Sequence, residues 1–489
     1  MKSIRKVLIA NRGEIALRII RACKELGIKS VSVFSEADLA GVWVRKADEA
    51  YPLIGNHVDV YLNYAKIIDV AKRANCDAIH PGYGFLSESA EFAEACEKNG
   101  IIFIGPRAEH IALFGDKIAS KVAMKKVGVP VLEGTDEPIA DIGEGEKIAQ
   151  SIGFPVIIKA AFGGGGRGMR IVREASEFRE LYESATNEAI KYFGKGEMFI
   201  EKFVENPRHI EVQVIADKYG NVVHLGERDC SIQRRHQKVI EIAPSPSLNE
   251  KTREKISKIA VDAVKKVGYE SVGTVEFLVD AQDNIFFIEM NTRVQVEHPV
   301  TEIISAIDII QRMIEIAGGD TLKYKQEEIL LRGFAIEFRI NAEDPKNNFM
   351  PAIGTITNYM APGGPGVRLD TSVYSGYTIP PYYDSMVGKL IVFALDWDGV
   401  VKKATRALDE FVIDGIKTNI PLHRAIVRDE DFKQGNFNTS YLEQKLDKFN
   451  LDAINFMEDE EKKLETLTKL MDKMKSNKQF VMQGKEPLF

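Results

Sequence analysis

Two acidic residues face each other in a hairpin that the sequence predicts over residues 274–291. Two apolar runs flank a polar four-residue turn, which is the pattern of paired antiparallel strands. Pairing Asp280 with Ile285 places Glu276 directly opposite Glu289 on one face of the hairpin. Carboxylates ~5 Å apart would repel by roughly 3 kcal/mol at an effective dielectric of ~20. A divalent cation reverses the sign of that interaction, so the pair predicts a Mg²⁺ site that also accepts phosphate oxygens.

Polar side chains continue along the same face beyond the hairpin. If the chain stays extended, Asn291, Arg293, Gln295 and Glu297 project to the same side as Glu289. Asn291 can add a neutral oxygen to the metal site, and the remaining cation, amide and acid suit a small anion beside a general base. The alternative is a surface hairpin with two exposed acids, which the apolar flanks make the weaker hypothesis.

A glycine-rich segment follows a short apolar strand. Residues 156–158 are apolar, Lys159 ends the strand, and residues 163–166 are all glycine. Such a loop brings backbone N–H groups close to phosphate oxygens and can close as a lid. A flexible linker is the plain alternative, but linkers rarely lie between a buried strand and a basic one. The segment is not a Walker A loop, because Lys-Ser/Thr does not follow the glycines.

Three further segments could contact a nucleotide. Residues 209–214 alternate strictly between polar and apolar, with His209 on the polar face. Residues 201–204 precede them and predict a strand whose backbone could contact an adenine edge. Residues 227–241 contain four Lys or Arg residues and one histidine. Such a run is usually a solvated surface, but here it lies between strand pairs, where a triphosphate requires positive charge.

The elements that must position these residues form an α/β protein. Strands and helices alternate at the start of the chain, which favours a parallel sheet wrapped by helices. The expected strands are residues 7–10, 30–34, a strand ending near 79, and 101–104; the expected helices are 14–26, 66–74 and 89–98. No G-x-G-x-x-G follows the first strand, so a nicotinamide-dependent dehydrogenase is a poor hypothesis.

Changes in composition predict three lobes and a tail. The expected divisions are a Rossmann-like parallel-sheet lobe at 1–115, a central lobe at 116–330 with the glycine-rich lid at about 132–203, a mixed α/β lobe at 331–446 and a helical tail at 447–489. Within the tail, residues 458–475 form a charged helical pattern with a narrow apolar stripe of Leu464, Leu467 and Met471. We expect this stripe to dock onto a partner subunit; packing against the third lobe is the alternative.

Composition and charge limit the functional classes. The 489 residues include 65 Lys plus Arg and 72 Asp plus Glu, for a formal net charge of −7, which does not favour nucleic-acid binding. The four cysteines form no C-x-x-C pair, so neither a zinc site nor a disulfide framework is expected, and a reducing cytoplasm fits best. The apolar run at 7–10 is too short for a signal-peptide core or a membrane span.

Five segments resemble the biotin carboxylase family of ATP-grasp ligases, the subunits that carboxylate biotin in acetyl-CoA carboxylases and two-subunit pyruvate carboxylases. The segments are 80–85, 159–169, 228–241, 289–302 and 338–345, and the similarity extends to about residue 446. The resemblance implies an ATP-grasp central lobe and ATP- and bicarbonate-dependent carboxylation of biotin through carboxyphosphate. This reaction is the first half of an acyl-CoA or 2-oxoacid carboxylase.

The resemblance also implies roles for individual residues. ATP would be held by Lys117, Lys159, Glu201, Lys202, Val204, His209, Gln233 and His236, with Gly165 and Gly166 over its phosphates. Mg²⁺ or Mn²⁺ would be bound by Glu276, Glu289 and Asn291. Bicarbonate would contact Arg293, Gln295, the backbone of Val296 and Lys238, with Glu297 as the base. Arg339 would stabilise the biotin enolate, and Tyr83 would line the biotin pocket.

The same resemblance predicts partners. Biotin would arrive on a carrier protein or domain of another chain, a separate carboxyltransferase subunit would use the product, and the chain itself would form a homodimer. The final acceptor stays open among acetyl-CoA, propionyl-CoA, pyruvate and 2-oxoglutarate. Two alternatives are another ATP-grasp ligase of the carbamoyl-phosphate or purine-pathway type, which should lack the Arg293–Glu297 order, and a non-catalytic scaffold, which should lose the acidic positions.

Overall fold

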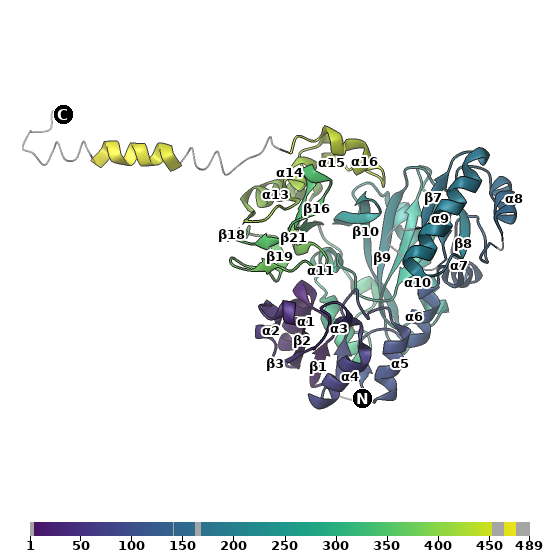
Figure 1. Ribbon diagram of the computed structural model, residues 1–489, viewed down its shortest axis with the longest axis horizontal. Helices are drawn as coiled ribbons and strands as arrows, with labels where there is room; N and C mark the ends of the chain where they lie inside the picture. The colour runs from purple at the N-terminus through teal and green to yellow at the C-terminus, as the bar shows by residue number, and fades with distance from the viewer. Residues whose placement is uncertain (1–3, 140, 162–167, 452–463, 476–489) are drawn as a thin grey trace, which may run out of the picture.

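The computed structural model describes residues 4–139, 141–161, 168–451 and 464–475. The chain forms three lobes. Figure 1 shows the N-terminal lobe in purple, the central lobe in blue and teal, and the third lobe in green. The predicted α/β class is confirmed. The lid residues Gly165 and Gly166 lie outside the described residues.

The N-terminal lobe is a parallel sheet with strand order β3-β2-β1-β4-β5, covered by helices. Its elements are β1 (Lys6–Ile9), α1 (Gly13–Glu25), β2 (Lys29–Phe34), α2 (Val42–Lys46), β3 (Glu49–Pro52), α3 (Asp59–Leu62), α4 (Tyr64–Arg73), β4 (Ala78–His80), α5 (Ala90–Lys98), β5 (Ile102–Phe103) and α6 (Ala108–Gly115). The expected strands and helices are therefore confirmed. The sequence did not predict β3, an edge strand with alternating half-buried and exposed residues, because it has no apolar run.

The central and third lobes share one eight-stranded sheet with the order β13-β12-β9-β10-β11-β14-β21-β19. In the central lobe the elements are α7 (Lys117–Lys126), β9 (Arg208–Ala216), β10 (Val222–Arg234), β11 (Gln237–Ala243), α10 (Glu250–Lys266), β12 (Ser271–Val279), β13 (Ile285–Asn291), α11 (His298–Ser305) and α12 (Ile309–Gly318). Strand β11 pairs with β14 of the third lobe, so the sheet continues across the expected boundary near residue 330.

A separate three-stranded sheet, β7-β6-β8, lies in the predicted lid region. Its elements are α8 (Ile142–Ile152), β6 (Val156–Ala160), β7 (Met169–Val172), α9 (Phe178–Phe193) and β8 (Met198–Lys202). The sheet and its two helices enclose a small apolar core of their own that includes Ile158, Phe178 and Ile200. A unit with its own core can move as one body against the larger sheet.

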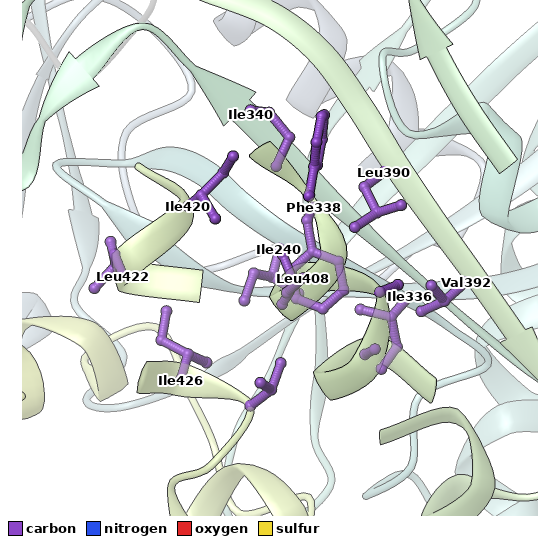
Figure 2. Packing of buried hydrophobic residues seen from close by; sticks show 14 of the residues in the cluster. Ile240, Ile336, Phe338, Ile340, Leu390, Val392, Leu408, Ile420, Leu422 and Ile426 are labelled. Carbon is purple, nitrogen blue, oxygen red and sulfur yellow. The ribbon is translucent and has the colours of Figure 1, made fainter. Parts of the chain in front are cut away.

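The third lobe packs helices against its part of the large sheet. Its elements are β14 (Phe334–Asn341), β15 (Glu343–Asp344), β16 (Met350–Pro351), β17 (Gly354–Thr355), β18 (Asn358–Met360), β19 (Val367–Thr371), β20 (Thr378–Ile379), β21 (Met386–Ala394), α13 (Trp397–Glu410), β22 (Val412–Asp414), α14 (Ile420–Ile426), α15 (Glu430–Lys433) and α16 (Tyr441–Lys445). Figure 2 shows Ile336, Phe338 and Ile340 from β14 among side chains of β21, α13 and α14. The apolar residues alternate along β14, which leaves Glu337 and Arg339 on the opposite face.

The tail contains a helix at residues 464–475, and the rest of the expected 458–475 helix lies outside the described residues. Every residue of 464–475 is exposed, including Leu464, Leu467 and Met471. Figure 1 draws this helix in yellow, away from the three lobes. Among the described residues, no helix has the length and apolar character needed to cross a bilayer.

Candidate active site

Three buried or half-buried carboxylates form a row across β13, β12 and β9. Glu276 pairs with Glu289 on one side and with Glu211 on the other. The predicted Glu276–Glu289 pair is confirmed, but the expected Asp280–Ile285 register is wrong, because Ile285 pairs with Val279. The pairing is irregular between Glu276 and Phe277, where β13 has one residue more than β12. This extra residue shifts the register by one, so Glu276 still lies opposite Glu289.

Glu289 has the environment of a cation ligand. Among the described residues its carboxylate has no hydrogen-bond or ion-pair partner. Burial, and then the charge of Glu276, raise the pKa of Glu289 above its ordinary value, whereas Lys117 opposes the shift. A buried carboxylate beside a second one is destabilised until a positive charge is added. The donor set of two carboxylates and an amide oxygen therefore fits Mg²⁺ or Mn²⁺.

Glu276 lies at the centre of a dense hydrogen-bond network. It accepts from His209 Nε2 at 2.7 Å, Lys238 Nζ at 3.0 Å, Asn291 Nδ2 at 2.8 Å and Gln295 Nε2 at 2.7 Å. Burial alone would raise the pKa of Glu276, but Lys238 and His209 hold it well below the ordinary value. The carboxylate is therefore ionised at neutral pH. Ligand atoms of His209, Glu211 and Glu276 also lie within 4.8 Å of one another, as do those of Glu211, Cys230 and Glu297.

The segment after β13 is not extended, so the predicted continuous polar face is wrong in its geometry. Strand β13 ends at Asn291, and Glu297 is the N-cap of α11. The side chains nevertheless converge. Arg293 donates to Asn291 Oδ1 at 2.8 Å and to Glu88 at 2.9 Å, while Gln295 reaches Glu276. A turn thus replaces the expected strand and brings the same residues closer together.

Lys238 on β11 links three carboxylates. Its Nζ lies 2.5 Å from Glu211, 3.0 Å from Glu276 and 2.6 Å from Glu297. Burial would lower the pKa of Lys238, but Cys230 and the three carboxylates raise it well above its ordinary value, so it stays protonated. It is the kind of fixed positive charge that holds a small anion next to a base.

Glu297 and Arg339 form the other end of this network. Arg339 Nη2 donates to Glu297 Oε2 at 3.0 Å, and Arg339 Nε donates to Glu241 Oε1 at 2.5 Å. Burial would raise the pKa of Glu297, but Lys238 and then Arg339 hold it below the ordinary value, so Glu297 is an ionised carboxylate that can accept a proton. Burial raises the pKa of Glu241 to about 7 although Arg339 opposes the shift.

Arg228 positions Gln295, and the sequence analysis gave it no individual role. Its side chain is fully buried and donates to Glu211 at 2.5 Å, to Gln213 at 2.7 Å and to Gln295 at 2.6 Å. The basic run at 227–241 is therefore only partly a solvated surface, since most of β10 and β11 is buried whereas residues 235–237 at the turn between them are exposed. The alternation that placed His209 on the polar face also places Glu211 there, and this signal could have identified the partner of Arg228.

The residues expected to hold ATP phosphates lie beside the lid sheet. Lys159 on β6 donates to Glu201 on β8 at 2.7 Å, and Lys121 on α7, which the sequence analysis did not identify, lies 3.1 Å from the same carboxylate. Lys117 begins α7, and burial lowers its pKa. Lys202 is bound elsewhere, since its amine donates to the backbone carbonyls of residues 153 and 154.

The remaining nucleotide positions lie along β10 and after β8. Gln233 Nε2 lies 2.6 Å from His209 Nδ1, so Gln233 and Glu276 fix both nitrogens of the His209 ring. Burial would lower the pKa of His209, but Glu276 raises it. His236 has a positive φ in the β10–β11 turn and is exposed. Val204 is half-buried in the loop between β8 and β9.

Tyr83 lines a cavity of about 310 Å³ between the N-terminal and third lobes. The cavity is bordered by the β1–α1 connection and the 83–85 turn on one side and by Tyr382, Tyr383 and Asp384 on the other. Tyr83 donates its hydroxyl hydrogen to Glu14 on α1. An aromatic, partly polar cavity of this size suits a small cyclic organic substrate.

Comparison with known families decides between the ATP-grasp classes. Residues 116–325 match the ATP binding domain of the carbamoyl-phosphate synthase L chain, which is shared among ATP-grasp ligases. The flanking regions are specific: residues 3–111 match the biotin carboxylase N-terminal domain, and residues 337–444 match the biotin carboxylase C-terminal domain. The chain belongs to the biotin carboxylase family. It is a ligase that carboxylates biotin with ATP and bicarbonate, and the two flanking matches favour it over another ATP-grasp ligase of the carbamoyl-phosphate or purine-pathway type.

Relatives of this biotin carboxylase match over nearly their whole length. The 2-oxoglutarate carboxylase small subunit of Hydrogenobacter thermophilus is 53% identical, over 90% of this chain and 93% of its own. The biotin carboxylase of Nostoc sp. is 52% identical, over 90% and 98%. The biotin carboxylase domain dimer of the Hydrogenobacter enzyme, solved with MgADP, ADP and bicarbonate, has a TM-score of 0.89 at 52% identity and covers 91% of this chain and 98% of that one.

Proposed function

We propose that this biotin carboxylase performs the first half-reaction of an acyl-CoA or 2-oxoacid carboxylase, with the residues around Lys238 as its catalytic centre. One observation carries the assignment of the centre: Lys238 bridges the predicted metal carboxylate Glu276 and the predicted base Glu297. An activated phosphate and a bicarbonate must meet at one point, and this ammonium lies between the residues suited to each.

We assign ATP to the face between the lid sheet and the large sheet. The proposed ligands are Lys117, Lys159, Glu201, Lys202, Val204, His209, Gln233 and His236, with Gly165 and Gly166 of the lid over the phosphates. The contacts of Lys159 with Glu201 and of His209 with Gln233 support this grouping, because each fixes the orientation of a polar side chain, one pair in each of the two sheets. Mg²⁺ held by Glu276, Glu289 and Asn291 would neutralise phosphate charge and polarise the γ-phosphate.

We assign bicarbonate to Arg293, Gln295, the backbone of Val296 and Lys238. The Glu297 carboxylate takes the bicarbonate proton, and the freed oxygen attacks the γ-phosphorus, so that ADP leaves and carboxyphosphate forms. Carboxyphosphate then separates into CO₂ and phosphate. The phosphate removes the proton from the biotin ureido nitrogen, and that nitrogen bonds to the carbon of CO₂. The guanidinium of Arg339 stabilises the negative charge that develops on the ureido oxygen.

We place biotin in the cavity lined by Tyr83, with the ring directed toward Arg339. Support comes from the lining of the cavity, which combines the rings of Tyr83, Tyr382 and Tyr383 with polar Asn11 and Arg12. The biotin would be attached to a carrier on another chain, and a carboxyltransferase subunit would complete the carboxylase.

We propose that the chain forms a homodimer, as in the Hydrogenobacter structure. We also propose a cytoplasmic location, with which the four buried free cysteines are consistent. The proposed domains are residues 1–115, 116–330, 331–446 and 447–489.

ADP formation tests the proposed function. With ATP and Mg²⁺, the purified chain should release ADP slowly with bicarbonate alone and much faster when free biotin is added. No ADP above background with bicarbonate and biotin together would contradict catalysis by these residues. ADP formation that depends on ammonia instead of biotin would contradict the assignment of biotin as the substrate.

The tail is predicted to bind a partner subunit. Its stripe of Leu464, Leu467 and Met471 is exposed, and an isolated helix of this length is marginal in water. Truncation after Leu446 should leave Tm and carboxylation of free biotin near normal but reduce co-purification with the carrier or carboxyltransferase chain. A Tm lowered by many degrees with an intact complex would instead identify the tail as an internal support.

A further inference from the structure

A chain of buried contacts connects the wall of the biotin cavity with the bicarbonate loop. The hydroxyl of Tyr83 donates to Oε1 of Glu14. The same oxygen lies 3.2 Å from Nζ of Lys389. Lys389 in turn donates to the carbonyl oxygen of Val296 at 2.6 Å. Three side chains from α1, β21 and the turn after β4 thus lead from the cavity to the residue just before the proposed base Glu297.

Lys389 is an unusual residue to place in this position for packing alone. Its side chain is fully buried, and it lies directly opposite Arg339 in the β14–β21 pair. Two cations opposite each other in a sheet repel, and a buried lysine is stable only when it is paired. Burial would lower the pKa of Lys389, but Glu14 and Glu337 raise it, so the ammonium is retained and donates to the carbonyl of Val296.

Glu14 is the shared element of this chain. It is buried, its Oε1 accepts from Tyr83 and lies 3.2 Å from Nζ of Lys389, and its Oε2 has no hydrogen-bond partner among the described residues. Tyr83 and Lys389 therefore share one carboxylate oxygen. A shift of the Tyr83 hydroxyl would change the charge density that this oxygen offers to Lys389, and with it the position in which Lys389 holds the carbonyl of Val296. Hydrogen bonds that share an acceptor in a buried site influence one another in this way.

We propose that Tyr83, Glu14 and Lys389 form a positioning relay that couples occupancy of the biotin cavity to the geometry of the bicarbonate loop. Lys389 acts through Val296 and does not touch the reacting atoms. A ligand that contacts the Tyr83 ring would set the Glu14–Lys389 contact and so bring the backbone of Val296 and the carboxylate of Glu297 into position. This inference rests on the proposed sites for biotin and bicarbonate.

Tyr83→Phe tests the relay with the smallest structural change, because it removes one hydroxyl and keeps the ring. The bicarbonate KM of ADP formation at saturating biotin should rise by about fivefold or more, the lower range of typical coupling between sites. A residue that only lines the cavity would change the biotin KM and leave the bicarbonate KM unaltered. Glu14→Gln should raise the bicarbonate KM as well, and the double variant should add little to either single one.

Tyr441→Phe is the matched control. Tyr441 is also buried and donates to a carboxylate, Asp429, which also accepts from a lysine, Lys445, but this triad lies in the third lobe and reaches neither proposed site. Its bicarbonate KM should equal that of the wild type. A bicarbonate KM within twofold of the wild type in both Tyr83→Phe and Glu14→Gln would overturn the relay. Absence of biotin-dependent ADP formation in the wild type would instead overturn the proposed function.

Discussion

Glu289→Gln is expected to lower Mg²⁺-dependent ATP cleavage on the order of 100-fold, equivalent to about 3 kcal/mol of transition-state stabilisation. The substitution keeps the shape of β13 but removes one of the two charges that would offset the metal. Thermal stability should stay the same or rise slightly. The sign follows from the raised pKa of Glu289: the folded state disfavours its charge at neutral pH, and a neutral amide removes that penalty.

Titration with Mg²⁺ provides the measurement for Glu289→Gln. Rates should recover in part at high Mg²⁺, because Glu276 and Asn291 remain. Glu250→Gln, which changes an exposed carboxylate on α10, is the matched control and should leave the Mg²⁺ dependence unchanged. Wild-type turnover of Glu289→Gln at low Mg²⁺ would show that the paired carboxylates do not bind the metal.

Arg339→Ala is expected to reduce biotin carboxylation by roughly 10² to 10³-fold, the usual loss when a group aimed at a developing negative charge is removed. Bicarbonate-dependent ATP cleavage without biotin should survive in part, because the proposed phosphate ligands lie elsewhere. In the pH profile of this ATP cleavage, the fall in rate on the acid side should move to higher pH. Arg339 helps to keep the pKa of Glu297 low, so without Arg339 the base protonates at a higher pH and the rate falls earlier on acidification.

Separate assays of ADP and carboxybiotin over a pH range check both parts of this expectation. Arg339→Lys is the informative companion variant, since it keeps the charge but lacks the planar guanidinium that contacts Glu241 through Nε and Glu297 through Nη2. We expect the pH profile of ATP cleavage by Arg339→Lys to stay close to that of the wild type, while its rate of biotin carboxylation falls. Normal carboxylation of free biotin by Arg339→Ala would exclude a role for this guanidinium at the biotin enolate.

Local alternation was sufficient to predict much of the site. The period of two along β12 and β13 placed Glu276 opposite Glu289, and the pattern along β9 placed His209 on the polar face. The register was still wrong near the turn, since the extra residue in β13 leaves no mark in an apolar run. The same local pattern could have identified Glu211, which lies two residues after His209.

The remaining parts depend on contacts between distant segments. Glu14 and Lys389 are separated by most of the chain, and nothing near either residue indicates that the other lies 3.2 Å away. Arg228 was visible only as a member of a basic run, and its burial follows from the large sheet that encloses it.

Transfer of labelled carbon from bicarbonate to biotin tests the assignment of this site as a biotin carboxylase centre. The purified chain is incubated with ATP, Mg²⁺, ¹⁴C-bicarbonate and free biotin, and both ADP and label bound to biotin are measured. The account predicts one acid-labile ¹⁴C-carboxyl group on biotin for each ADP whose formation requires biotin, and loss of this label in Glu297→Gln. ADP formation that biotin accelerates without any label on biotin would contradict the assignment of this site as a biotin carboxylase centre.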